Sequence, residues 1–263
     1  SMSLTGKTKA GSYKDLLQMN QNNTGIGTSA KPIVDGEGTA SALSISDDQV
    51  IVQPQNDDTT DVLMASDKDG NRLFKVDSSN DLVKAGIGQH IVNTQVKCFN
   101  LASPNTQPTT TDTWAMMSAQ GESRFGAEVT FGTGSTPATT YTISNNAHDV
   151  VMGLWYLPFN ITIDSCNVWF GADAASGDAV KFSVMQYAVD SANGSTSGDL
   201  SSGSELCNQS LAISGAGYEQ AYYKALTVAS ANVDAGKVIM AFVHQNGTNA
   251  DLTVNMQLVY HLR

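Results

Sequence analysis

The stretch that decides the fold is "LTVNMQLVYHL", residues 252–262, close to the end of the chain. Every second residue from Leu252 to Tyr260 is apolar or aromatic, whereas the residues between them are mostly polar. Successive side chains of a strand point to opposite faces, so this period of two predicts a half-buried antiparallel strand.

Four more segments upstream have the same strand-like character. They are "PFNITIDSCNVWF" (158–170), "VKFSVMQYAV" (180–189), "AYYKALTV" (221–228) and "VIMAFVHQ" (238–245). The segments are separated by polar loops rather than by helical patterns. Long strands at regular spacing without intervening helices predict a C-terminal antiparallel β-sandwich, jelly-roll-like, over residues 114–263.

The first third of the chain predicts short β units joined by many turns. We expect residues 1–90 to form an N-terminal stalk or attachment region and the Pro/Thr-containing residues 91–113 to form a connector. One helix-like piece, residues 12–20, precedes these strands. Short strands with so few large apolar residues are marginal alone, so we expect copies of the chain to bury them against one another. The predicted fold class is mainly β.

The composition excludes several kinds of partner. Charged residues make up only 15% of the chain, the net charge is -11, and no cluster of Lys and Arg is present. An average field of this sign repels nucleic acid and offers nothing to an anionic membrane. No apolar run approaches the ~20 residues of a membrane span, so no membrane insertion is expected. The widely spaced cysteines, Cys98, Cys166 and Cys207, are predicted to be small buried hydrophobes.

The acidic stretch at residues 67–71 has part of the pattern of a metal site. Asp67, Asp69 and Asn71 alternate like the first ligands of a calcium loop. Position 6 of such a loop is Arg72 instead of Gly, and position 12 is Ser78 instead of Glu. Asp-Gly between two strand-like runs is typical of a β-hairpin, so we predict a turn and no metal ligand.

No catalytic motif is present. The sequence lacks a Gly-x-Ser-x-Gly elbow, and the histidines have no zinc-ligand spacing. Acids for glycosidase chemistry occur without any pattern. These acids are Glu122, Glu128, Glu205, Glu219, Asp149, Asp164 and Asp178, and the histidines are His90, His148, His244 and His261. We therefore predict no catalytic, cofactor-binding or metal residue and no enzyme activity.

Aromatic residues provide the candidate contacts. Trp114, Trp155, Tyr156 and Trp169 are candidates for stacking on a sugar, but Trp155-Tyr156 and Trp169-Phe170 lie within apolar stretches, which favours packing in the core. Tyr222 and Tyr223 are adjacent, so on a strand one of them faces outward. We predict these two tyrosines as the receptor contact.

One segment carries a family resemblance. "DKDGNRLFKVDSSNDLVKAGIG" (67–88) resembles a segment common in the fibre and spike proteins of tailed bacteriophages, and residues 13–58 look like the start of marine-phage structural proteins. The resemblance implies a homotrimer located in the virion, with an N-terminal stalk and a C-terminal β domain that faces outward. It implies copies of the chain, other virion proteins and a host-cell surface glycan as partners. It supplies no catalytic residue and no cofactor.

The expected function is therefore that of a non-enzymatic virion structural protein: a tail fibre, a spike or a capsid decoration. Its C-terminal domain would bind a host surface glycan or another receptor. Two alternatives stay open. One is a glycan-degrading appendage enzyme, a depolymerase, which requires two facing carboxylates. The other is a cellular carbohydrate-binding or adhesin module.

Overall fold

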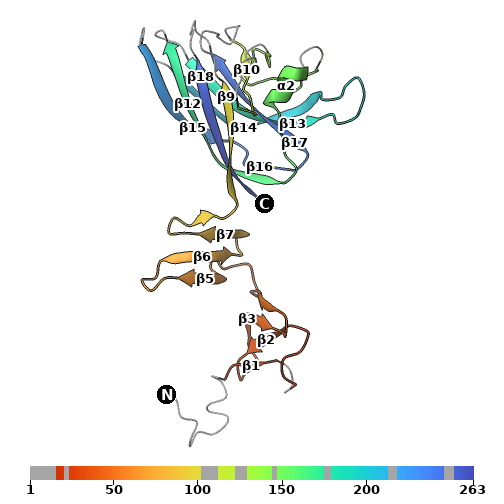
Figure 1. Cartoon of the computed structure of the whole chain (residues 1–263), viewed down its shortest axis with the longest axis vertical. Coiled ribbons are helices and arrows are strands. Elements are labelled where there is room, and N and C mark those ends of the chain that lie inside the picture. The colour runs from red at the N-terminus through yellow and green to blue at the C-terminus, as the bar shows by residue number, and fades with distance from the viewer. Residues whose placement is uncertain are drawn as a thin grey trace, which may run out of the picture. The chain divides into compact units, whose positions relative to one another are not determined.

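The structure is a computed structural model, and it describes residues 16–20, 24–101, 112–121, 129–143, 147–174, 179–212, 218–245 and 252–263 (Figure 1). The chain divides into two compact units, residues 1–92 and 93–263. Antiparallel strands make up nearly all the regular structure of both units, which confirms the predicted mainly β class.

The N-terminal unit contains two four-stranded antiparallel sheets, each with its strands in chain order. The first consists of β1 (Gln18–Met19), β2 (Lys31–Val34), β3 (Ala40–Ile45) and β4 (Val50–Val52). The second consists of β5 (Leu63–Ser66), β6 (Arg72–Asp77), β7 (Leu82–Ala85) and β8 (His90–Ile91). The helix predicted over 12–20 is wrong in its described part, because Gln18–Met19 pair with β2 as strand β1; residues 12–15 lie outside the described residues.

The C-terminal unit is built from one ten-stranded antiparallel sheet. Its strands are β9 (Thr94–Leu101), β10 (Trp114–Met116), β11 (Trp155–Tyr156), β12 (Ile161–Ala174), β13 (Ala179–Val189), β14 (Leu200–Ala212), β15 (Tyr218–Val228), β16 (Asn232–Val233), β17 (Lys237–Gln245) and β18 (Thr253–Leu262). Their order is β10-β17-β13-β14-β15-β12-β18-β9, with β11 beside β17 and β16 beside β12.

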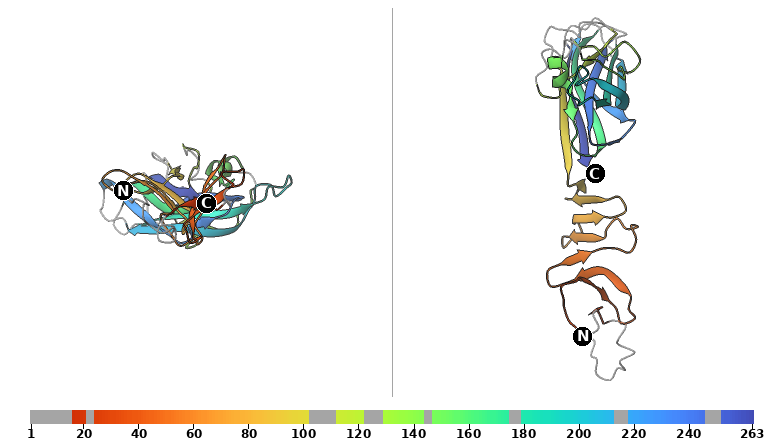
Figure 2. Two further views of the ribbon diagram at one scale, coloured as in Figure 1. Left: turned by 90° about the horizontal axis from the view of Figure 1, so that it is seen from below. Right: turned by 90° about the vertical axis from the view of Figure 1, so that its right-hand side faces the viewer.

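This sheet curls so that its two ends face each other, and the curl can be followed in Figure 2. Only two residue pairs join β14 to β15, Cys207 with Val228 and Asn208 with Thr227. We call β10-β17-β13-β14 the β13 half and β9-β18-β12-β15 the β12 half. The eight main strands, counted along the chain, run 2-7-4-5 in one half and 1-8-3-6 in the other, which is jelly-roll topology. The predicted sandwich is thus one continuous sheet folded over.

The first strand of this unit lies where a connector was predicted. β9 pairs with β18 along its whole length, from Thr94 opposite His261 to Leu101 opposite Val254. Phe99 and Leu101 are buried in the core. The connector predicted over 91–113 is therefore wrong for Thr94–Leu101, whereas residues 102–111 lie outside the described residues. Alternation places only these two large apolar residues of β9 inward, so its sequence does not stand out as a strand.

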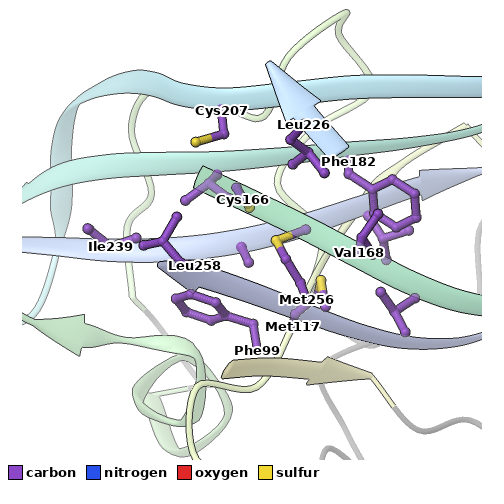
Figure 3. Close-up of a cluster of buried hydrophobic side chains, with 14 of the residues drawn as sticks. Phe99, Met117, Cys166, Val168, Phe182, Cys207, Leu226, Ile239, Met256 and Leu258 are labelled. Atoms are coloured by element: carbon purple, nitrogen blue, oxygen red, sulfur yellow. The ribbon is translucent and has the colours of Figure 1, made fainter. Parts of the chain in front are cut away.

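Apolar side chains from both halves fill the space between them (Figure 3). The labelled members are Phe99, Met117, Cys166, Val168, Phe182, Cys207, Leu226, Ile239, Met256 and Leu258. The alternation predicted for residues 252–262 is confirmed, because Val254, Met256 and Leu258 are buried while Thr253 and Gln257 are exposed.

The outer face of the β13 half is covered as well. Residues 129–143 and the helix α2 (Ala147–Gly153) contribute to a second buried cluster there. This second layer buries β17 on both faces, which explains the continuous apolar run "VIMAFVHQ". Within the ranges that the structure describes, no helix is long and apolar enough to cross a bilayer. The outer face of the β12 half, by contrast, carries exposed large side chains.

Candidate functional site

The strand register aligns two rows of side chains on the outer face of the β12 half. Reading across the sheet, one row is Tyr223, Trp169, Asn255 and Asn100, and the next is Ala225, Asn167, Gln257 and Cys98. We call these eight residues the amide–aromatic face. None of them carries a formal charge, which is unusual for the surface of a chain with a net charge of -11.

Two aromatic rings meet at one end of this face. The centroids of Trp169 and Tyr223 are 5.1 Å apart with an interplanar angle of 48°. Trp169 is 54% exposed and Tyr223 is 52% exposed. The Tyr223 hydroxyl donates a hydrogen bond to Asn167 Oδ1 at 2.9 Å, which fixes the position of its ring. Large aromatic side chains that stay open to solvent while their orientation is fixed are suited to contact a ligand.

Alternation along β15 separates the two tyrosines predicted as the receptor contact. Tyr223 points outward, whereas Tyr222 points inward and stacks on Phe170 with 5.1 Å between ring centroids and an angle of 19°. Tyr222 is thereby part of the packed interior of the unit. Only Tyr223 of the predicted pair is placed to meet a ligand on the outer face.

The core position predicted for Trp169 is wrong. Val168 and Phe170 occupy the inward positions on either side of it. A β-bulge between Ile163 and Ser165 shifts the alternation of β12, so a period of two counted from Ile161 fails at this point. In the sequence, the apolar residues Val168 and Phe170 flank Trp169 on both sides. This was the signal that could have identified Trp169 as an outward residue. Trp155 packs against the core beside Phe99, in agreement with the predicted packing, whereas the core position predicted for Tyr156 is wrong because Tyr156 is exposed. Trp114 is buried.

The amides of the face form their own hydrogen bonds. Asn255 Nδ2 donates to Asn100 Oδ1 at 2.6 Å, and Gln257 Nε2 donates to Asn255 Oδ1 at 3.4 Å. These bonds orient donor and acceptor groups beside the two rings. A ring face that covers the apolar side of a sugar, next to oriented amides that bond hydroxyl groups, is suited to a neutral glycan.

The acids that the sequence analysis considered for glycosidase chemistry are described only in part. Glu205 accepts hydrogen bonds from Ser183 Oγ at 2.7 Å and Asn208 Nδ2 at 2.6 Å in the β13 half. Asp164 lies in the β12 half and contacts His261 Nδ1 at 2.9 Å. Glu122, Glu128 and Asp178 lie outside the described residues, as do the side chains of Asp149, Glu219 and His148. The two candidates with described side chains, Glu205 and Asp164, therefore lie in different halves of the jelly roll.

The acidic stretch at 67–71 forms the turn between β5 and β6, as predicted. Asp67 Oδ1 accepts hydrogen bonds from the backbone N–H groups of Asp69 and Asn71, at 2.9 and 2.8 Å. Its Oδ2 accepts a third from Asn71 Nδ2 at 2.8 Å. Gly70 has a φ of 84°, which favours glycine at this position. In the part of the chain with described coordinates, no three His, Cys, Asp or Glu side chains cluster to hold a metal.

The cysteines do not all behave as predicted. Cys166 and Cys207 are buried in the core, but Cys98 is exposed on the amide–aromatic face. The hydrogen bond that joins the Cys166 and Cys207 thiols and burial both raise the pKa of the Cys166 thiol. The prediction of a small buried hydrophobe is therefore wrong for Cys98, because its position on β9 alternates with the inward Phe99.

Comparisons with known proteins define no family. No protein-family model matches the chain, and no curated protein matches it. Among solved structures, an α-amino acid ester hydrolase labelled with selenomethionine is similar with 8% sequence identity and a TM-score of 0.28. The match covers 76% of this chain, and the chain spans 42% of the hydrolase.

Proposed function

We propose that the chain is a non-enzymatic structural protein of a virion, a fibre, spike or capsid decoration, that functions as a homotrimer. In this proposal the N-terminal unit joins the copies, and the jelly roll presents the amide–aromatic face to a host surface glycan. The sequence resemblance of residues 67–88 to phage fibre and spike proteins supports it. The observation that carries it is the uncovered apolar face of the second N-terminal sheet.

The two faces of the β5–β8 sheet differ in character. By the register of the strands, one face carries the apolar side chains of Leu63, Ala65, Phe74, Val76, Val83 and Ala85, with His90 beside Ala85 at the edge. Leu63, Phe74 and Val83 are exposed on it. The other face carries the charges, with Lys75 Nζ 3.1 Å from Asp61 Oδ1 and Lys84 Nζ 3.6 Å from Asp77 Oδ2. The sheet is amphipathic, and its apolar face needs a cover.

The N-terminal unit has little core of its own to stabilise such sheets. Among its described residues, Val34 is the only buried apolar side chain. A small sheet is stable only when its hydrophobic face packs against something. A partner that the unit requires in order to fold must be present whenever the chain is made, and another copy of the chain meets that condition. The charge-free face also lets copies with a net charge of -11 meet without opposing like charges.

The assembly is tested by measuring the mass of the whole chain with light scattering after size exclusion, at micromolar concentration. The wild type should have the mass of three chains. Phe74→Asp places a charge on the apolar face and should abolish the trimer. Met64→Asp is the matched control, because Met64 pairs with Lys75 on the opposite face and is similarly exposed, 48% against 37% for Phe74. A monomeric wild type, or a trimer that survives Phe74→Asp, contradicts the proposal.

The receptor contact is tested by binding of the purified protein to host cells and to the polysaccharide extracted from them. Trp169→Ala and Tyr223→Ala should each weaken binding. Tyr156→Ala serves as the control, because Tyr156 is 57% exposed on β11, outside the amide–aromatic face. Unchanged binding by both face variants would contradict the assignment of this face. Release of reducing ends from the polysaccharide would identify a depolymerase instead.

A further inference from the structure

A pocket of about 320 Å³ opens at the β13 half, and the proposed function does not use it. It lies where β13 and β14 meet the loop residues Ser135 and Thr136. Binding sites for small molecules have volumes of ~300–1,000 Å³, so this pocket is large enough for one small ligand. It belongs to the half of the jelly roll that does not carry the amide–aromatic face.

A fixed carboxylate forms one side of the pocket. Glu205 accepts a hydrogen bond at each oxygen, from Ser183 Oγ at 2.7 Å and from Asn208 Nδ2 at 2.6 Å. The register explains this arrangement, because Ser183 and Asn208 are directly opposite on β13 and β14. A carboxylate has about four acceptor sites, so each oxygen can accept a further hydrogen bond from a ligand. The geometry of Glu205 is therefore set before a ligand arrives.

A cation lines the same pocket. Lys181 lines the pocket, and the register places it opposite Ser210 on β14. Its ammonium group has no ion-pair partner among the residues that the structure places. Nearby hydroxyl groups of Ser135, Thr136 and Ser210 can each donate and accept. The pocket thus combines one donor-only group, one acceptor-only group and several groups that do both.

An aromatic side chain supports the base of the pocket. Trp114 lines it and is almost completely buried. Its Nε1 donates a hydrogen bond to the Gly134 carbonyl at 2.9 Å, which ties the strand β10 to the loop that carries Ser135 and Thr136. The loop side of the pocket is therefore anchored to the sheet.

We infer that this pocket binds a single neutral, polyhydroxylated ring, such as a hexose unit. A ring hydroxyl donates to the Glu205 carboxylate and accepts from the Lys181 ammonium, so neighbouring hydroxyls satisfy both charged groups at once. An anionic sugar would oppose Glu205 within a chain of net charge -11, and a cation would oppose Lys181. A neutral polyol is the ligand that avoids both conflicts. The ring can be a free monosaccharide or the terminal unit of a glycan.

The test is saturation-transfer NMR on the whole chain with separate neutral hexoses, N-acetylhexosamines, uronic acids and neutral oligosaccharides. Neutral rings should bind and uronic acids should not. Glu205→Gln and Lys181→Met should each weaken binding roughly 10-fold or more, because each removes a charged hydrogen-bonding group. The measurements are repeated in a Trp169→Ala background, which removes the proposed receptor contact, and Glu205→Gln and Lys181→Met should have the same effects there.

The outcomes distinguish the two sources of the ring. Binding of monosaccharide and oligosaccharide with equal affinity indicates a free ring, and tighter binding of the oligosaccharide indicates a glycan terminus. Melting curves of both pocket variants verify that they fold, and Ser210→Ala on the exposed part of β14 provides a milder variant of the same site. Absence of binding by every neutral sugar, or binding that Glu205→Gln and Lys181→Met leave unchanged, overturns the inference.

Discussion

The indole of Trp114 packs against the imidazole of His244, with ring centroids 5.1 Å apart. His244 is 4% exposed, and its Nδ1 has no hydrogen-bond partner among the described residues. Burial lowers the pKa of His244, the nearby Lys181 lowers that pKa further, and Asp112 partly opposes them. The folded protein therefore favours the neutral imidazole of His244, which belongs to β17 in the β13 half.

The first prediction is that His244 makes the unit less stable in mild acid. An unfolded histidine takes up a proton near pH 6.5, whereas the lowered pKa of His244 delays this uptake in the folded state. The contribution of His244 to the free energy of unfolding is present above the pKa of the unfolded histidine, and it is lost as the pH falls below that value. Urea unfolding at pH 7 and pH 5 should show a smaller difference for His244→Gln than for the wild type. His90→Gln, at an exposed position of β8, should keep the wild-type difference. An identical difference in all three proteins would refute the prediction.

The second prediction concerns β9, which sequence patterns placed in a connector. Phe99 is fully buried between the halves, so Phe99→Ala should reduce the free energy of unfolding of the C-terminal unit by about 3–5 kcal/mol. Val96→Ala on the same strand is the control, because Val96 is exposed and should change this free energy by less than about 0.5 kcal/mol. Urea unfolding monitored by tryptophan fluorescence measures both. Equal effects of the two substitutions would mean that β9 does not pack into the jelly roll.

The third prediction concerns a close approach between β14 and the loop over the β13 half. A Cβ atom at Gly203 would lie 2.5 Å from Tyr187 Cε1 and 2.8 Å from the Thr139 Cα. The Gly203 N–H also donates to the Thr139 carbonyl at 2.8 Å, so the two backbones cannot separate without losing that bond. Gly203→Ala should therefore cost about 1–3 kcal/mol in unfolding free energy. Gly194→Ala, where a Cβ meets nothing within 4 Å, should be nearly neutral in the same urea titration.

The strands with clear alternation could be predicted from sequence because one physical rule governs them. Residues 252–262 face the core on one side and solvent on the other, so the pattern of β18 is the pattern of its burial. The predicted jelly-roll-like sandwich followed from several such strands. β17 fits a different rule, since both its faces are covered and its sequence is apolar throughout.

The parts that sequence reasoning missed depend on contacts between distant segments. Nothing in β9 alone reveals that β18 pairs with it. The helix α2 has only 7 residues, and tertiary packing rather than its own propensity stabilises so short a helix. For the candidate site, alternation along a strand was enough to predict that one of the two tyrosines, Tyr223, faces outward. The outward position of Trp169 could not be predicted in this way, because the bulge near Ser165 shifts the alternation. The pocket at Glu205 combines residues from three strands and a loop, so no local sequence motif predicts it.

The last prediction addresses the acidic turn between β5 and β6. The three hydrogen bonds to Asp67 lower the pKa of its carboxyl, and the bond from the Asn71 side chain is the largest cause. These bonds stabilise the turn while Asp67 is ionised, and that contribution is lost as the pH falls through the lowered pKa. Asp67→Ala should therefore lower the melting temperature of the N-terminal unit at neutral pH. Asp69→Ala should not, because the Asp69 side chain pairs with Lys68 in an exposed ion pair of little energetic value, and the backbone N–H that bonds Asp67 is kept.

Calcium provides the decisive measurement for this turn. The Asp67 oxygens already accept backbone and amide hydrogen bonds, so a cation would have to displace the donors that form the turn. Millimolar calcium should leave the melting temperature of the wild type unchanged. A rise of several degrees in the wild type that is absent from Asp67→Ala would show that the turn binds the metal after all. Both interpretations, the hydrogen-bonded turn and the calcium site, depend on Asp67, so the variant Asp67→Ala decides between them.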